Sequence, residues 1–124
     1  MYEKIGLKFL QTLSPELAHT IALRYLQLKI FTAASMKHKI QYPKLKTEIA
    51  GIELQNPVGL AAGFDKNAVA IKPIGHLGFG FLEVGAVTPQ SQPGNLKPRV
   101  FRIPEEKAIV NHYGFNNDGM VRVN

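Results

Sequence analysis

The sequence contains no cysteine among its 124 residues. A chain without cysteine forms no disulfide and no thiolate metal site, so both are excluded. It also has no run of about 20 apolar residues, which a membrane-spanning helix needs, and no secretory signal pattern at its N-terminus, so we expect no segment to cross a membrane. Hydrophobic residues nevertheless make up 45% of the chain and charged residues 19%. This composition is typical of a globular protein rather than a disordered one.

Acidic residues are scarce in the first third of the chain. Residues 1–46 hold eight basic residues and two acidic ones, whereas residues 47–124 hold seven of each, so the first part carries the whole net charge of +6. Composition and periodicity also change between Tyr42 and Pro43. We therefore predict a helical extension over residues 1–42 and a second part over residues 43–124. The basic residues form no nucleic-acid-binding motif, so no nucleic-acid partner is expected.

Two helices are predicted in the extension. Apolar side chains recur at helical spacing in residues 2–13, at Tyr2, Ile5, Phe9 and Leu13. Ser14 is the expected N-cap of a second helix, with Pro15 at its first position and Glu16 in its first turn. That helix should run to about Phe31, and most of its surface is apolar.

The two basic, apolar-faced helices have two possible explanations. They lie on an anionic membrane surface, or they pack on the rest of the protein. His19 falls within the apolar arc of the second helix, where a histidine is more often a hydrogen-bonded core residue than a functional one.

From residue 47 onward the pattern changes to that of strands. "TEIAGIEL" predicts a hairpin around Ala50 and Gly51. "NPVGLAA", "DKNAVAIKPIGHLG" and "FGFLEVGAVTP" predict a strand, a short helix and a second strand, which is a βαβ unit with parallel strands. The fold class is therefore α/β. The glycines of "GHLGFG" and "GLAAGFDK" fit neither the dinucleotide fingerprint nor the Walker loop.

Small residues occupy the ends of both predicted parallel strands. Ala61, Ala62 and Gly63 end the first strand, and Gly85 and Ala86 end the second. Ligands of parallel α/β folds bind beyond the carboxyl ends of the strands, and small side chains let a flat ligand approach the backbone. Lys66 would lie at the mouth of such a site, where its ammonium could bind an anionic group of the ligand. The alternative is tight helix-on-strand packing beside an exposed lysine.

A segment of about 30 residues follows the second strand and is rich in proline. Loops of this length within a compact domain are usually functional. Within it, "RVFRI" and "AIV" are expected to pair as antiparallel strands and to present "NHYGFNN" over the site. The amides, imidazole and phenol of this stretch suit a small polar heterocycle, although a polar turn without a ligand has the same composition.

Three stretches, "NPVGLAAGFDKN", "GFGFLEVGAVTPQSQPGNLKPRVFR" and "AIVNHYGFNN", together resemble the dihydroorotate dehydrogenase family in order and spacing. The helical extension with "SPELAH" resembles that of the membrane-associated, quinone-dependent class 2 enzymes. The resemblance implies the first part of a flavin-containing β/α barrel. It also implies oxidation of dihydroorotate to orotate in pyrimidine synthesis, with electrons leaving to a quinone.

The resemblance assigns roles to individual residues. The FMN cofactor would be lined by Ala62, Gly63, Phe64, Asp65, Lys66 and Ala86. The substrate would be bound by Lys66 and by the 111–115 peptide, which consists of Asn111, His112, Tyr113, Gly114 and Phe115. Asn111 would hydrogen-bond to the pyrimidine. His19 and Arg102 match positions that border the quinone tunnel, and no metal is implied.

Several expectations qualify this assignment. The family usually has a hydroxyl residue at the position of Ala86, so we expect this chain to lack one side-chain hydrogen bond to FMN, worth about 0.5–1.5 kcal/mol. A β/α barrel takes about 250 residues, so we expect this chain to be an N-terminal fragment, with the family's catalytic serine beyond Asn124. The expected location is the cytoplasmic side of the cell membrane, as a peripheral protein. The alternatives are a flavin barrel with a soluble acceptor and a lipid-binding helical module without catalysis.

Overall fold

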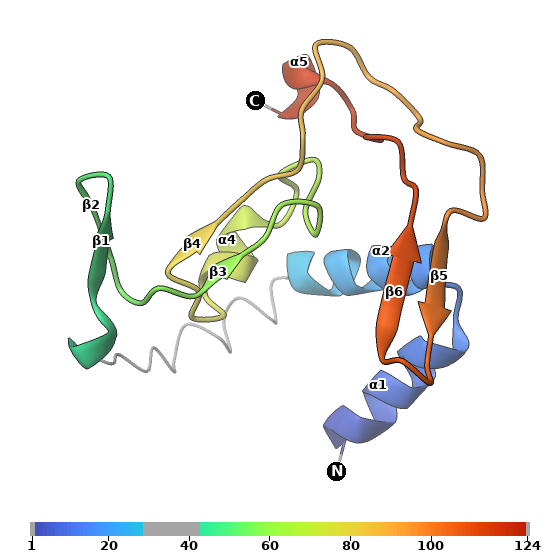
Figure 1. The fold of residues 1–124 in the computed structure, drawn as a ribbon, viewed down its shortest axis with the longest axis horizontal. Helices are drawn as coiled ribbons and strands as arrows, with labels where there is room; N and C mark the ends of the chain where they lie inside the picture. Colours follow the sequence, from blue (N-terminus) through green and yellow to red (C-terminus); the bar gives the residue numbers. More distant parts are fainter. Residues whose placement is uncertain (1, 29–42, 124) are drawn as a thin grey trace.

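The structure is a computed structural model that describes residues 2–28 and 43–123 (Figure 1). Its elements are α1 (Tyr2–Thr12), α2 (Pro15–Gln27), the 3-10 turn η1 (Pro43–Leu45), β1 (Thr47–Ile49), β2 (Ile52–Leu54), β3 (Gly59–Leu60), α4 (Ile71–Gly75), β4 (Phe81–Leu82), β5 (Val100–Ile103), β6 (Ala108–Asn111) and α5 (Met120–Val123). The predicted boundary before Pro43 depends on Tyr42, which lies outside the described residues.

Both predicted helices of the extension are present. Ser14 occupies the N-cap position of α2 and Pro15 its first position, as predicted, although the Ser14 side chain makes no capping hydrogen bond. The Ser14 carbonyl instead accepts the N–H of Ala18 at 3.0 Å. The predicted end near Phe31 is wrong, because Leu28 has extended backbone angles (φ −65°, ψ 131°) and α2 ends at Gln27.

The hairpin predicted from "TEIAGIEL" is confirmed. Strands β1 and β2 pair antiparallel, with Thr47 opposite Leu54 and Ile49 opposite Ile52. Ala50 and Gly51 both have positive φ, 51° and 81°. This is the backbone of a two-residue hairpin turn whose twist matches that of the strands.

The predicted βαβ unit is also confirmed, with shorter elements than expected. Strands β3 and β4 are parallel, and Gly59 and Leu60 lie opposite Phe81 and Leu82. The helix between them covers only α4 instead of residues 65–78. Residues before α4 form a turn because the Asp65 carboxylate accepts the N–H groups of Val69 (2.9 Å) and Ala70 (2.7 Å). Such side-chain bonds compete with helical ones.

A small core joins the extension to the βαβ unit. Leu26 of α2 packs with the buried residues Ala70 and Ile74. Side chains from the flanking elements complete this cluster: Leu23, Leu60, Phe64, Phe79 and Leu82. Gln27 adds a hydrogen bond from Nε2 to the Val69 carbonyl at 3.0 Å. Packing on the rest of the protein, one of the two explanations of the helices, therefore holds for one face of α2.

The long loop contains the predicted antiparallel pair. Strands β5 and β6 pair with Val100 opposite Asn111 and Ile103 opposite Ala108. The pair lies against α2, and the chain then continues to α5 (Figure 1). The described residues form three two-stranded open sheets and no closed barrel. The α/β class is thus confirmed, with only a parallel pair of strands in place of a barrel.

Candidate functional site

The carboxyl ends of β3 and β4 meet at one cavity. Because the strands are parallel, their ends lie at the same edge. The cavity has a volume of about 540 Å³, within the range of ligand pockets. It is lined by Ala62, Gly63, Lys66, Gly85, Ala86 and residues 111–116. The two strand ends and the 111–115 peptide, predicted separately to form a site, are thus brought together.

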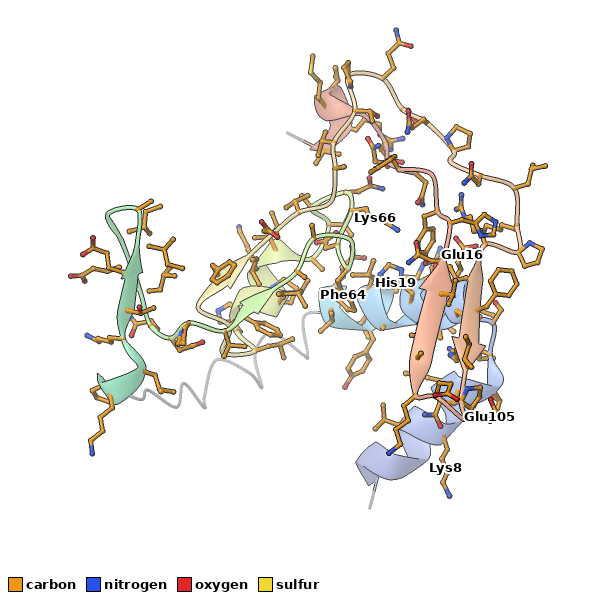
Figure 2. All side chains as sticks on the ribbon, viewed as in Figure 1. Lys8, Glu16, His19, Phe64, Lys66 and Glu105 are labelled. Atoms are coloured by element: carbon orange, nitrogen blue, oxygen red, sulfur yellow. The ribbon has the colours of Figure 1, made fainter. Side chains whose placement is uncertain are left out.

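Phe64 and Asp65, two of the residues predicted to line the flavin, do not line the first cavity. Phe64 packs against the core cluster, and its carbonyl accepts a hydrogen bond from His19 Nε2 at 2.5 Å (Figure 2). A carbonyl has no proton to donate, so this bond requires a hydrogen on Nε2 of His19. Asp65 is only 4% exposed and caps the turn before α4. "GLAAGFDK" therefore combines a structural carboxylate with a lysine in the cavity.

Lys66 lies between the cavity floor and the 111–115 peptide. Its Nζ lies 3.2 Å from the centroid of the Tyr113 ring, close enough for a cation–π interaction. Burial lowers the pKa of Lys66 below its ordinary value of 10.5, Arg99 lowers that pKa further, and the Glu16 carboxylate acts in the opposite direction. The half-buried ammonium has no carboxylate within ion-pair distance among the described residues, and so suits an anionic ligand.

The 111–115 peptide has a strained residue beside the cavity. Phe115 has a positive φ of 55°, and its side chain is 68% exposed. Strained backbone in non-glycine residues clusters at ligand-binding sites. Burial raises the pKa of Tyr113 above 10.0, and the charge of Glu16 adds to this effect. Tyr113 therefore stays a neutral phenol beside Lys66.

Asn117 is a structural residue that the sequence did not distinguish from its neighbours. It is 5% exposed, and its side chain bonds to Thr88, to the Phe115 carbonyl and to the N–H of Gly119. These bonds fix the start of the long loop to the end of the 111–115 peptide. The stretch "NHYGFNN" contains three side-chain amides, and that of Asn117 forms hydrogen bonds within the protein. Asn116 Oδ1 is buried without a hydrogen-bond partner.

A second cavity of about 860 Å³ lies between α2 and the long loop. His19, Leu23, Lys66 and Asn116 are among its lining residues. Because Lys66 and Asn116 also line the first cavity, the two adjoin. His19 therefore lines a cavity that adjoins the strand-end site.

Arg102, predicted to border the quinone tunnel, lines neither described cavity. Its guanidinium donates hydrogen bonds to the carbonyls of Leu10 (3.3 Å), Gln11 (3.2 Å) and Leu13 (2.6 Å). Carbonyls at the end of a helix have no hydrogen-bond partner within the helix, and a cation there also interacts favourably with the helix dipole. Arg102 thus attaches α1 to β5. Within residues 2–28 and 43–123, no cluster of His, Asp or Glu could hold a metal.

Comparison with known proteins identifies the family of this chain. The family model for dihydroorotate dehydrogenase matches residues 44–124. This chain belongs to the dihydroorotate dehydrogenase family. The resemblance predicted from the sequence is therefore confirmed.

Individual relatives of this dihydroorotate dehydrogenase family member cover nearly the whole chain. "Dihydroorotate dehydrogenase (quinone)" of Cereibacter sphaeroides is 46% identical over 121 residues, which are 98% of this chain and 33% of that protein. The mitochondrial protein of that name from Mus musculus is 47% identical over 90% of this chain and 27% of its own length. A crystal structure of DHODH from Eimeria tenella in complex with ferulenol superposes with a TM-score of 0.73 and 43% identity, over 88% of this chain and 28% of that one. The chain thus spans about a third of the curated relatives' length.

Proposed function

We propose that this chain forms part of an enzyme that oxidises dihydroorotate to orotate in pyrimidine synthesis, with a quinone as electron acceptor. The observation that carries the proposal is the convergence of Lys66 and the 111–115 peptide over a floor of small residues. The quinone-dependent names of the relatives support the choice of acceptor.

The first cavity fits the flavin that we propose as cofactor. Ala62, Gly63, Gly85 and Ala86 leave one side of the cavity free of large side chains, so a flat ring can approach main-chain N–H and C=O groups. FMN, when bound, would supply the hydride chemistry of the oxidation. Ala86 has no hydroxyl, so its contact is restricted to backbone and a methyl group. Phe64 and Asp65 would support this site from behind rather than line it.

The remaining residues bind and orient the substrate in this proposal. Dihydroorotate carries a carboxylate, and the Lys66 ammonium is the cation that faces the cavity. Asn111, at the end of β6, presents an amide that can pair with a pyrimidine edge. The exposed Phe115 ring lies at the same cavity, where it would cover the substrate and exclude water.

A turnover assay tests the reaction. The purified complete gene product is expected to form orotate from dihydroorotate with a ubiquinone analogue as acceptor, and to form none when dihydroorotate is omitted. Turnover with fumarate or NAD but not with quinone would favour a soluble acceptor and contradict the quinone proposal. Absence of orotate with every acceptor would contradict the reaction itself.

We also propose a peripheral location on the cytoplasmic side of the cell membrane. No helix among the described residues is long and apolar enough to span a bilayer. Helices α1 and α2 carry exposed large apolar side chains at Leu7, Phe9, Leu17 and Ile21. The extension also holds the excess positive charge. Apolar insertion and attraction to anionic lipid would act together at such a surface.

Vesicle sedimentation tests the membrane proposal. The complete gene product should co-sediment with vesicles containing anionic lipid, and binding should weaken as salt is raised. The Leu7→Gln/Phe9→Gln double variant should bind several-fold more weakly. The Leu96→Gln variant, which changes a leucine that is 91% exposed outside the helices, should bind normally. Equal loss in both variants, or no binding at any salt concentration, would contradict the proposal. Vesicle binding without any turnover would favour the lipid-binding module.

A further inference from the structure

An ion pair links the helical extension to the long loop. Glu16, in the first turn of α2 (Figure 2), accepts hydrogen bonds on Oε1 from Arg99 Nε (3.0 Å) and Nη2 (2.9 Å). The side chain of Arg99 is 7% exposed and that of Glu16 is 21% exposed. A shielded pair of this kind is costly to break from one side, because the remaining charge stays buried without compensation.

Arg99 also holds the loop that supports the 111–115 peptide. Its Nη1 donates hydrogen bonds to the carbonyls of Pro93 (2.6 Å) and Asn95 (3.0 Å). Asn95 then holds the peptide directly, from its N–H to the Tyr113 carbonyl (2.9 Å) and from Nδ2 to the His112 carbonyl (2.7 Å). A continuous chain of hydrogen bonds therefore runs from Glu16 of the extension to the backbone of the 111–115 peptide.

Charged and aromatic groups of this hydrogen-bond chain also lie close to Lys66. The centroid of the Tyr113 ring lies 3.2 Å from Lys66 Nζ and 5.3 Å from the guanidinium carbon of Arg99. Two cations thus share one ring, and Glu16 is the carboxylate paired with one of them. The titratable and charged groups lining the two cavities around Lys66 are Glu16, His19, Asp65, Lys97, Arg99, His112, Tyr113 and Asp118.

We propose that Glu16 is a positioning residue for the substrate site: acting through Arg99, it holds the 111–115 peptide in place and sets the charge that Lys66 presents to an anionic substrate. This inference rests on the proposed function. It assigns to the helical extension, beyond any role toward membrane or quinone, a role in binding the substrate.

The charge of Glu16 favours the protonated form of Lys66, and that of Arg99 opposes it. Loss of the Glu16 charge should therefore lower the pKa of Lys66 further. Affinity for an anionic ligand falls as pH rises through the pKa of Lys66, because the ammonium is lost. In a variant without the Glu16 charge, this fall should occur at lower pH than in the wild type.

The test is calorimetric titration of the complete, flavin-loaded gene product with orotate across a pH series, with steady-state kinetics alongside. Glu16→Gln is expected to weaken orotate binding and raise the KM for dihydroorotate about tenfold, with kcat changed less than about twofold. The pH midpoint of orotate binding should move downward. Glu16→Asp keeps the charge and should keep the wild-type midpoint even where its KM rises.

Lys97→Gln is the matched control. Lys97 is the other partner of Glu16, at 3.7 Å, but its side chain is 68% exposed, and exposed pairs contribute little. This variant should bind orotate like the wild type. A Glu16→Gln variant with wild-type KM and pH midpoint would overturn the inference, as would a midpoint shift in Glu16→Asp equal to that of Glu16→Gln. If Glu16→Gln does not fold, the Glu16→Gln/Arg99→Gln double variant, which leaves no unpaired charge, should still raise the KM, and a wild-type KM in that variant would overturn the inference. A wild type that binds no orotate would instead contradict the proposed function.

Discussion

Replacing Lys66 with methionine is expected to lower kcat/KM for dihydroorotate by about 10²–10³-fold, the range seen when one preorganised electrostatic group is lost from an active site. Lys66 reaches the strand-end cavity as a half-buried cation next to the Tyr113 ring. Methionine keeps the length and apolar stem of the side chain but removes the charge. The measurement is steady-state turnover of the complete gene product, with quinone held at saturation.

Stability measurements separate this loss from misfolding. The pKa of Lys66 is lowered in the folded protein, so the unfolded chain holds this proton more tightly. The protonated lysine therefore costs stability at neutral pH, and the cost disappears only as pH rises above the lowered pKa and through 10.5. Lys66→Met should thus be at least as stable as the wild type at pH 7. Lys72→Met, at an exposed lysine of α4, should keep full activity. A Lys66→Met enzyme with more than half of wild-type kcat/KM would contradict the assigned role.

Local signals in the sequence predicted much of the backbone. The Ala50 and Gly51 turn, the βαβ pattern and the pairing of "RVFRI" with "AIV" depend on neighbouring residues, and the structure contains all three. Element ends were less predictable. Helix α4 is short because the Asp65 side chain accepts hydrogen bonds from N–H groups four and five residues later. Helical periodicity in the sequence does not reveal this hydrogen bonding.

The candidate site was predictable only in part. Small residues at two strand ends indicated a shared cavity, and the predicted pairing of the long loop placed "NHYGFNN" over it. The family resemblance then assigned substrate-binding roles to residues 111–115. The contact between Glu16 and Arg99 spans 83 residues and leaves no periodic signal. Phe64 and Asp65 stand beside cavity residues in the sequence, yet a tight turn directs them to the core and to the turn before α4. Neighbours in a motif therefore lie at different places: Phe64 belongs to the core cluster, whereas Asp65 and Lys66 both line the second cavity.

Replacing Gly94 with alanine is expected to destabilise the protein by about 2–5 kcal/mol and to weaken substrate binding. Gly94 has a φ of 74°, and an added Cβ would lie 2.2 Å from the Tyr113 carbonyl oxygen and 2.8 Å from Arg99 Nη1. The left-handed backbone costs about 1–2 kcal/mol for a residue with a Cβ, and forcing extra atoms into a packed site costs about 1–3 kcal/mol more. The nearest of these atoms is a backbone oxygen, so rotation of a side chain cannot relieve the clash.

This steric clash should affect function as well as stability, because the Tyr113 carbonyl accepts the hydrogen bond from Asn95 that holds the 111–115 peptide. Chemical denaturation measures the free energy of unfolding, and orotate titration measures the site. Gly6→Ala is the matched control, since nothing lies within 4 Å of its added Cβ and alanine within a helix is more stable than glycine by about 0.5–1 kcal/mol. The two substitutions should therefore change stability in opposite directions. If Gly94→Ala is as stable as the wild type and binds orotate equally well, the close packing of the long loop on the 111–115 peptide is not what holds the substrate site together.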